Sequence, residues 1–333
     1  MTPSELALQL GKLATQRLPF SVMIWGAPGV GKSSIVAEVA AANGLELVDL
    51  RLSQLAPTDL RGLPVAEEGR SRWYPPEFLP TTGNGILFLD EINMAPPAMQ
   101  GVAQQLILDR RVGSYRVPDG WLIWAAGNRR TDKAAVFDMP APLANRFIHF
   151  DVEPDATSFR RWCLEHRVDE RINAFLAFRS TLLHKVDVNT PAWPSPRSWA
   201  VASRLLAADV PIAASVGAGA AAEFNAFCTV YGNLPDLDAI AAGKGDHFTF
   251  PAEPSARYAT VIGLSDRARD AEKAIASLQW LLDRADPEWM QLLLVDCLPV
   301  IRGSRQFGAF ARLAAENPAI RSFMAEARDL AIS

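Results

Sequence analysis

A glycine-rich turn near the N-terminus constrains this chain more than any other feature. It follows the apolar run "SVMIW" (21–25), which is typical of a buried strand, and it precedes "SSIVAEVAAAN" (33–43), which has a helical pattern. The intervening "WGAPGVGKSS" has the spacing GxxxxGK[ST]. A strand, this turn and a helix in succession are the context of a phosphate-binding loop. The predicted cradle comprises Gly26, Ala27, Pro28, Gly29, Val30, Gly31, Lys32, Ser33 and Ser34.

The chemistry of this loop predicts a nucleotide site. Glycines let backbone N–H groups converge on phosphate oxygens, and the N-terminus of the following helix adds partial positive charge. Lys32 can reach the β- and γ-phosphates, and the Ser33 hydroxyl can bind Mg²⁺. The alternative is a glycine turn beside a surface lysine, which the flanking strand and helix disfavour. We therefore predict ATP and Mg²⁺ as cofactors.

Two adjacent acids follow the apolar run in "GILFLDEIN" (85–93). We expect this strand to run parallel beside the strand that precedes the cradle, so that Asp90 can bind Mg²⁺ together with Ser33. A bound cation offsets the cost of placing a carboxylate at a buried strand end. Glu91 can then act on the attacking water as a general base or orient it. The alternative is an acidic strand end that faces solvent.

An amide follows another predicted strand, "WLIWAAG" (121–127). Asn128 can hydrogen-bond both a γ-phosphate and a water, which would let it sense hydrolysis. Asn in a simple turn is the alternative, because Asn is common there.

The first 154 residues alternate between short apolar runs and helical patterns, which predicts an α/β fold. Most of the apolar runs lack strict polar alternation, so both faces of each strand are expected to be buried in a parallel sheet flanked by helices. Predicted hairpins at 61–75 and 110–121 interrupt this alternation. The strands are predicted at 21–25, 45–52, 85–91, 121–127 and 147–153.

After about residue 154 the strand signal fades and helical periodicity prevails. The proline-rich joint 190–199 places Ser195 as a helix N-cap and Pro196 at the first helical position. The segment "VPIAASVGAGAAAEF" (210–224) is predicted as one packed helix, and 242–255 as a looser stretch.

Composition excludes several classes of protein. The net charge of -4 and the pI near 5.7 argue against an electrostatically driven nucleic-acid binder. The three cysteines form no CxxC or zinc spacing, so we expect a reduced, cytoplasmic location. No apolar stretch is long enough for a membrane span, so no membrane insertion is expected.

Taken together, these motifs resemble the AAA+ ATPases, and specifically the MoxR branch of the helix-2-insert clade. "GAPGVGKS" is similar to Walker A, "ILFLDEIN" to Walker B, and "AAGN" to sensor 1. "LSQLAPTDLRG" resembles the MoxR segment after the second strand, and the two predicted hairpins stand where the clade carries its insertions. "PAPLANRF" is similar to the stretch that ends in the arginine finger, and "PSPRSW" to sensor 2. The resemblance covers about residues 5–210.

The resemblance implies an AAA+ P-loop NTPase core with a five-stranded parallel sheet over 1–154, a helical lid over 155–210 and a helical extension over 211–333. It implies that Arg146 is the finger that contacts a neighbouring subunit's γ-phosphate, and that Arg197 is sensor 2. It also implies an ATPase that forms a ring, usually of six subunits, with ATP sites shared between them.

Hydrolysis in such a ring is expected to remodel, activate or assemble a client protein. Partners of this branch commonly carry a von Willebrand type A domain. Trp73 or Tyr74 on the first hairpin could contact a client, although Trp73 could instead pack under the hairpin.

Two other functions fit the same cradle. A P-loop kinase acting on a small molecule would need an acceptor pocket and would consume ATP only with its substrate. A nucleotide-switched scaffold or DNA-associated regulator would show little turnover, and the acidic pI disfavours its DNA-binding form.

Overall fold

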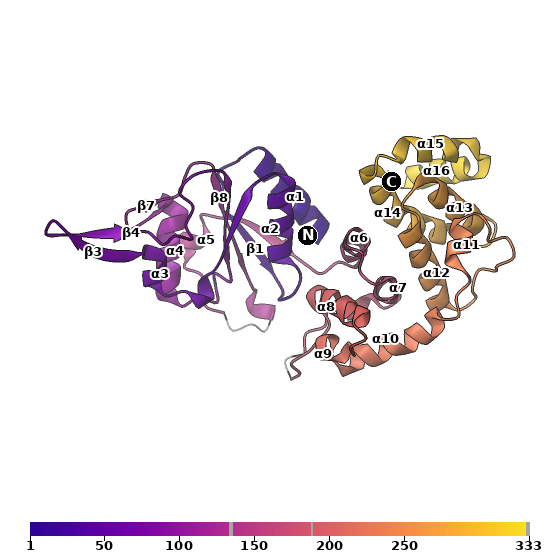
Figure 1. Ribbon diagram of the computed structural model, residues 1–333, viewed down its shortest axis with the longest axis horizontal. Helices are drawn as coiled ribbons and strands as arrows, with labels where there is room; N and C mark the ends of the chain where they lie inside the picture. The colour runs from indigo at the N-terminus through magenta and orange to yellow at the C-terminus, as the bar shows by residue number, and fades with distance from the viewer. Residues whose placement is uncertain (133–135, 188, 331–333) are drawn as a thin grey trace. The chain divides into compact units, whose positions relative to one another are not determined.

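The computed structural model describes residues 1–132, 136–187 and 189–330. The chain forms two compact units, Met1–Asp155 and Ala156–Ser333 (Figure 1). The first contains the sheet and the second is helical. The predicted lid and extension both belong to the second unit, and their separate roles stay a prediction. None of the helices in the described ranges is both long and apolar enough to span a bilayer.

The first unit is built on a five-stranded sheet in which every neighbouring pair is parallel. The strand order is β2-β5-β8-β1-β9. Each strand lies within two residues of its predicted bounds, so the predicted parallel sheet is confirmed. The central strands are buried on both faces, as their unbroken apolar runs indicated. The strands are β1 (Val22–Gly26), β2 (Glu46–Arg51), β5 (Gly85–Asp90), β8 (Trp121–Gly127) and β9 (Ile148–Val152).

One expectation about this sheet was wrong. Strand β5, which ends in Asp90, does not lie beside β1, because β8 lies between them. Val22 of β1 pairs with Trp124 of β8, and Gly85 of β5 pairs with Trp121 of β8. All seven residues of β8 are buried, which suits a strand with neighbours on both edges.

Helices cover both faces of this sheet (Figure 1). On one face α1 (Pro3–Thr15) and α2 (Lys32–Ala42) bury Leu6, Leu10 and Val36 against the strands. On the other face α3 (Pro57–Arg61) and α4 (Pro97–Asp109) bury Leu60, Met99 and Leu106. Thr2 and Glu5 begin α1 with a reciprocal capping box.

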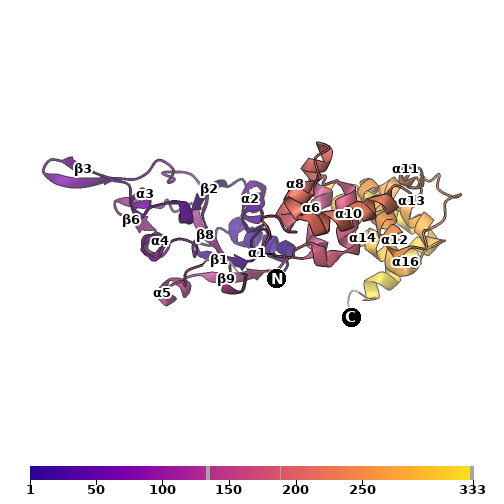
Figure 2. The ribbon, with the colours of Figure 1, turned by 90° about the horizontal axis from the view of Figure 1, so that it is seen from below.

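Both predicted hairpins are present. Strands β3 (Leu63–Glu67) and β4 (Arg70–Tyr74) pair antiparallel and extend from the rest of the first unit in both views (Figures 1 and 2). Strands β6 (Arg111–Val112) and β7 (Tyr115–Arg116) form the second hairpin. The Ser114 hydroxyl of the second donates a 2.6 Å hydrogen bond to the Trp73 carbonyl of the first, which ties the two hairpins together. The connecting segments of this unit include η1 (Leu52–Gln54), η2 (Arg130–Asp132) and α5 (Ala141–Ala144).

The second unit has two apolar clusters that share one helix. Phe175, Trp199 and Phe224 lie in the first cluster, and Leu278 and Leu293 lie in the second. Helix α12 packs into both clusters, which makes them one unit. The second unit contains the helices α6 (Ala156–His166), α7 (Glu170–Phe178), η3 (Ser180–Leu182), α8 (Pro196–Ala207), α9 (Ala213–Val216), α10 (Ala218–Tyr231), α11 (Leu237–Ala241), α12 (Pro254–Arg267), α13 (Ala271–Leu282), α14 (Pro287–Gly303), α15 (Phe307–Glu316) and α16 (Pro318–Leu330).

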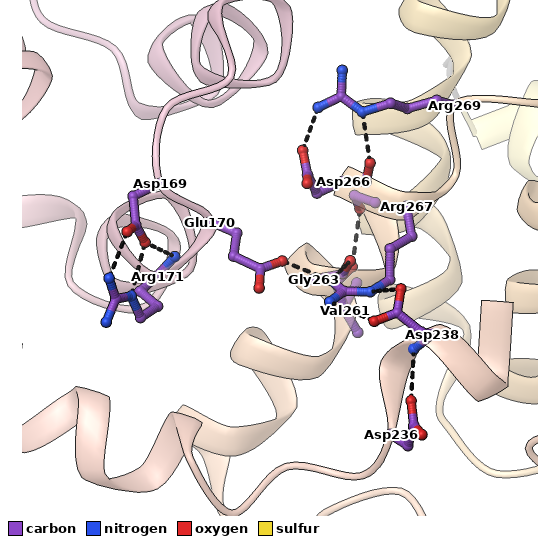
Figure 3. A network of polar contacts seen from close by, with 11 residues as sticks. Asp169, Glu170, Arg171, Asp236, Asp238, Val261, Gly263, Asp266, Arg267 and Arg269 are labelled. Carbon is purple, nitrogen blue, oxygen red and sulfur yellow. Dashed lines mark hydrogen bonds and ion pairs between the residues drawn. The ribbon is translucent and has the colours of Figure 1, made fainter. Parts of the chain in front are cut away.

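A polar network joins three of these helices at the end of α12 (Figure 3). The Arg267 guanidinium donates to Glu170 of α7 at 2.6 Å and to Asp238 of α11 at 2.9 Å. It also donates to the Gly263 carbonyl of its own helix at 2.9 Å. Burial lowers the pKa of Arg267, but the hydrogen bonds to Asp238 and Glu170 outweigh burial and raise the pKa above its ordinary value.

The segment 210–224 is not the single packed helix that its composition indicated. It breaks at Gly217, where φ is +82° and ψ is +158°, and α10 begins directly after this break. A Cβ on Gly217 would lie 2.7 Å from the carbonyl oxygen of Ala192. Close approach to the proline-rich joint therefore requires glycine at this position.

The joint itself follows the prediction. Ser195 is the N-cap of α8, and its hydroxyl accepts a 3.1 Å hydrogen bond from the Ser198 N–H. Pro196 is the first residue of the helix, where a missing N–H costs nothing.

Candidate nucleotide site

The glycine-rich turn lies between β1 and α2, as predicted. Gly26 ends β1, Gly31 is the N-cap of α2, and Lys32 begins the helix. Gly29 and Gly31 have φ of +79° and +103°, in the left-handed region that favours glycine. The loop therefore has the backbone geometry in which N–H groups can converge on an anion at the N-terminus of a helix. The loop also contains Ala27 and Pro28, between Gly26 and Gly29, and Val30, between Gly29 and Gly31. Ser33 and Ser34 follow Lys32 in the first turn of α2.

Close packing explains the first glycine of the motif. A Cβ on Gly26 would lie 2.7 Å from both the carbonyl oxygen and the Cγ1 atom of Val152 on β9. Gly26 thus allows β1 and β9 to approach while the chain turns out of the sheet.

The Lys32 ammonium is buried among oxygen acceptors. It donates to the carbonyl oxygens of Gly26 at 2.6 Å and Ala27 at 3.1 Å, and to Asn128 Oδ1 at 2.9 Å. The lysine therefore links the turn after β1 to the end of β8. An anionic oxygen that entered the loop would meet a cation whose position is already defined by these acceptors.

The side chains of Ser33 and Asp90 are hydrogen-bonded, although the strands that lead to them, β1 and β5, are not neighbours in the sheet. Ser33 Oγ donates to Asp90 Oδ2 at 2.6 Å, and Asp90 Oδ1 accepts from the Glu91 N–H at 2.8 Å. A hydroxyl and a carboxylate are hard oxygen ligands of the kind that Mg²⁺ prefers, with phosphate oxygens and water completing its octahedron. The residues present therefore fit a nucleotide-bound Mg²⁺. In the described part of the chain no three or more His, Cys, Asp or Glu residues cluster as metal ligands, so the nucleotide would have to supply ligands of its own.

Glu91 is held by a residue that sequence reasoning missed. Its carboxylate accepts a short hydrogen bond from the Ser53 hydroxyl, in η1 directly after β2. Glu91 has φ of +55°, which is unusual for a residue with a side chain and places backbone strain beside the acidic pair. Parallel strands end at the same edge of a sheet, so the position of Ser53 after β2 was the signal that could have identified it.

A third acid lies near the pair. Burial, followed by the negative charge of Asp90, raises the pKa of Asp49 on β2, and Glu91 adds to this effect while Arg51 opposes it. Asp49 therefore lies within electrostatic reach of both acids of the pair. No sequence motif singled out Asp49.

Asn128 directly follows β8, as predicted, and its backbone is hydrogen-bonded to the side chain of Asn93. Its N–H donates to Asn93 Oδ1 at 3.1 Å, and Asn93 Nδ2 donates to the Asn128 carbonyl at 2.7 Å. Asn93 is buried, and a Cβ on Gly127 would lie 2.5 Å from its Oδ1. The last residue of "GILFLDEIN" thus positions the amide that contacts Lys32, a role that sequence reasoning did not assign.

Arg146 follows the short helix α5 and is exposed. Within the described residues its side chain makes no ion pair or hydrogen bond. Nearby arginines are engaged: Arg129 pairs with Asp132 and Glu153, and Arg130 pairs with Asp138. Arg146 is therefore available to another molecule.

Arg197 lies in the first turn of α8 in the second unit and is exposed. It too makes no ion pair or hydrogen bond through its side chain within the ranges that the structure describes. Its contact with a nucleotide stays a prediction.

A known protein family matches the part of the chain that contains the phosphate-binding turn, the paired acids and most of the sheet. Residues 21–147 match the family described as "AAA domain (dynein-related subfamily)". These residues form an AAA domain. The predicted AAA+ P-loop NTPase core is thereby confirmed, since the AAA domain spans β1 to the end of α5 and contains four of the five strands of the sheet, β1, β2, β5 and β8.

Two named proteins match part of this chain. The chain is 28% identical to midasin of Giardia intestinalis over 154 residues, which cover 44% of this chain and 3% of that protein. It is 30% identical over 144 residues to the protein named "Putative chaperone BssE" of Thauera aromatica, covering 40% of this chain and 50% of that protein. The matched region thus spans half of BssE and a small fraction of midasin.

Solved structures include NtrX from Brucella abortus in complex with ADP. It is 15% identical, with 92% of this chain and 68% of that chain covered and a TM-score of 0.38. This score is low, and the fold is established by the sheet order and the AAA domain.

Proposed function

We propose that this chain is a MoxR-type AAA+ ATPase that couples ATP hydrolysis to the remodelling, activation or assembly of a partner protein. The observation that carries the proposal is the convergence of Lys32, Ser33, Asp90, Glu91 and Asn128 at one edge of the sheet, at the end of a phosphate-binding turn. The AAA domain and the relative named as a chaperone support the same class of protein.

In this proposal the cradle binds the phosphates of ATP. Lys32 exchanges its present acceptors for β- and γ-phosphate oxygens, and Asn128 contacts the γ-phosphate from the end of β8. Ser33 and Asp90 would hold Mg²⁺, which supplies positive charge to the phosphates.

Glu91 orients or deprotonates the attacking water. In this proposal the Ser53 hydroxyl, which donates to Glu91 Oε2, fixes the direction of the carboxylate and holds Glu91 in a resting arrangement. Rotation of Glu91 away from Ser53 is then part of activation.

Two arginines that lie outside the cradle complete the site. Arg146 contacts the γ-phosphate of a neighbouring subunit, which its exposure and its lack of partners in the described ranges allow. Arg197 links the helical lid to nucleotide, in its own subunit or a neighbouring one. An arginine supplied between subunits requires a repeating interface, and a closed ring of six subunits is the proposed assembly.

The β3–β4 hairpin is the proposed client contact. Leu63 is 69% exposed and Tyr74 is 42% exposed, whereas Trp73 is half-buried and lies 3.9 Å from the position of a Cβ on Gly113. Tyr74 rather than Trp73 is therefore the better placed aromatic. The client, or a partner with a von Willebrand type A domain, would dock on this apolar strand surface in the cytoplasm.

Replacement of the water-orienting acid tests this function. Glu91→Gln should retain ATP binding and reduce ATP turnover at least about a hundredfold, in the range expected for the loss of a general base. Glu165→Gln, on an exposed position of α6, is the matched control. Phosphate release and binding of a fluorescent ATP analogue measure the two effects. Unchanged turnover in Glu91→Gln, or wild-type turnover only with a small-molecule acceptor, would reject the proposal.

The same variant can identify the partner. Glu91→Gln held in ATP should retain a client protein that wild type releases, and mass spectrometry of the captured proteins would name it. Capture must be lost when Tyr74 and Leu63 are both replaced by Ser, because these side chains form the proposed contact surface.

A further inference from the structure

One imidazole in the first unit connects the strand before the cradle to the segment that carries Arg146. Trp25 Nε1 donates to His149 Nδ1 at 2.9 Å, and His149 Nε2 lies 2.8 Å from the Ala144 carbonyl oxygen. An indole nitrogen can only donate and a carbonyl oxygen can only accept. The histidine must therefore be neutral, with its proton on Nε2, to make both hydrogen bonds.

Trp25, Ala144 and His149 each lie close in the chain to the cradle or to Arg146. Trp25 immediately precedes Gly26 of the cradle, and Ala144 is the last residue of α5, two positions before Arg146. His149 lies on β9, three positions after Arg146, and pairs with Met23 of β1 in the sheet. The chain from Ala144 to His149 is thus a short turn, with Arg146 in its middle, whose two ends are joined by the imidazole.

Ring packing reinforces the connection. The rings of Trp25 and His149 lie nearly parallel, with centroids 6.1 Å apart and an interplanar angle of 7°, as a hydrogen bond between their edges requires. The Phe147 ring meets the imidazole edge-on at 6.2 Å. A displacement of Trp25 would therefore be transmitted to the imidazole through the hydrogen bond, while Phe147 limits the other movements of the imidazole.

The rest of this turn leaves the direction of Arg146 weakly defined. Its backbone N–H donates to the Leu143 carbonyl at 3.1 Å, and the Phe147 N–H donates to the Ala144 carbonyl at 3.2 Å. Leu143 and Phe147 are buried and anchor the turn, whereas Arg146 is exposed. The imidazole of His149 thus connects this turn to the side chain of Trp25 on β1.

We propose that His149 is a positioning residue that couples the nucleotide cradle of one subunit to the arginine that this subunit offers to its neighbour. The inference rests on the proposed function, because it concerns the regulation of the shared ATP site. Nucleotide in the cradle biases Trp25, Trp25 biases the imidazole, and the imidazole sets the angle at which Arg146 leaves the turn. Each site in the ring would then report its occupancy to the next.

The stability of the fold should depend little on this connection. His149 is exposed, and hydrogen bonds that water can replace contribute little to the free energy of unfolding. A loss of turnover without a loss of stability therefore separates positioning from a merely structural role.

The test compares His149→Leu with His149→Gln. Leucine removes both hydrogen bonds, whereas a glutamine amide can accept from Trp25 and donate to the Ala144 carbonyl. We expect His149→Leu to lower kcat about fivefold in the assembled protein, with KM for ATP within about twofold of wild type, and His149→Gln to restore kcat to within about twofold. Thermal unfolding should be unchanged in both.

A double-mutant cycle supplies the decisive readout. If His149 acts through Arg146, then His149→Leu should have no further effect on kcat in an Arg146→Ala background. An equal loss in both backgrounds, or no rescue by His149→Gln, would overturn the inference. His166→Leu, at an exposed histidine of α6, is the matched control and should leave kcat unchanged.

The outcomes separate this inference from the proposed function. If wild type does not hydrolyse ATP, or if Arg146→Ala leaves kcat unchanged, the shared ATP site itself is wrong. If Arg146→Ala lowers kcat and His149→Leu does not, the shared site stands and only the role of His149 is wrong.

Discussion

Ser33 donates a 2.6 Å hydrogen bond to Asp90, although the strands that lead to them, β1 and β5, are separated by β8. The bond is possible because the turn after β1 and the acids at the end of β5 lie at the same edge of the sheet, where all of its parallel strands end. The hydroxyl and carboxylate thereby form a ready pair of oxygen ligands. This relationship, rather than neighbouring strands, joins the phosphate-binding turn to the acidic pair.

Removal of this pair should weaken nucleotide binding only when Mg²⁺ is present. Asp90→Asn keeps the shape of the side chain and removes the charge that favours a cation, so the Kd for ATP should rise at least about tenfold with Mg²⁺. With EDTA, Asp90→Asn and wild type should have the same Kd. Titration with a fluorescent ATP analogue measures both conditions, with Asp109→Asn at the end of α4 as the control. An equal loss with and without Mg²⁺ would show that Asp90 acts on the fold and not on the metal.

Ser53→Ala should increase basal ATP turnover. The substitution removes the hydroxyl that holds Glu91, and one hydrogen bond to a charged group is worth about 1.5–3 kcal/mol, so we expect about a tenfold higher kcat before a client is added. Phosphate release measures this rate. The control is Ser71→Ala on the exposed β4 strand. A lower kcat in Ser53→Ala would instead mean that Ser53 places Glu91 for catalysis.

Arg160→Met should destabilise the second unit strongly at neutral pH. The Arg160 guanidinium lies 3.3 Å from Asp296 Oδ1, both side chains are buried, and the carboxylate would be left without its cation. Loss of one partner of such a pair costs about 3–5 kcal/mol in the free energy of unfolding. Denaturant titration measures this energy. Arg179→Met, which removes an exposed pair with Glu223, is the control and should cost under about 1 kcal/mol.

The same pair gives a pH dependence with a definite sign. Burial raises the pKa of Asp296 above its ordinary 3.8 and outweighs the opposing effect of Arg160. The folded state therefore binds the Asp296 proton more tightly than the unfolded state, so this stabilising contribution is present at low pH and is lost as pH rises through the folded pKa. Asp296→Asn removes the contribution, so the variant should gain stability relative to wild type as pH rises from about 3.8. A constant difference across this range would contradict the assignment.

Local patterns in the sequence were sufficient for the elements and for most of the site. The five strands, both hairpins, the helical second unit and the Ser195 cap follow from periodicity and turn residues, which depend on near neighbours along the chain. Lys32, Ser33, Asp90 and Asn128 could be found for the same reason, because each lies in a short motif next to a predicted strand.

Tertiary structure decided the contacts between motifs. Periodicity carries no information on strand order, so the position of β8 between β1 and β5 could not be read from the chain. Nor could the Ser53–Glu91 bond or the Asn93–Asn128 pair, whose partners come from different strands.

Gly217 and His149 also owe their roles to contacts with segments that are distant in the sequence. Gly217 interrupts a helical pattern with a positive φ and an extended ψ, and it must be glycine because the carbonyl of Ala192 occupies the space of a Cβ. His149 lies in no motif, and its significance comes from Trp25 and the Ala144 carbonyl. The sequence by itself determined which chemical groups the site contains, whereas packing between distant segments determined which groups hold them in place.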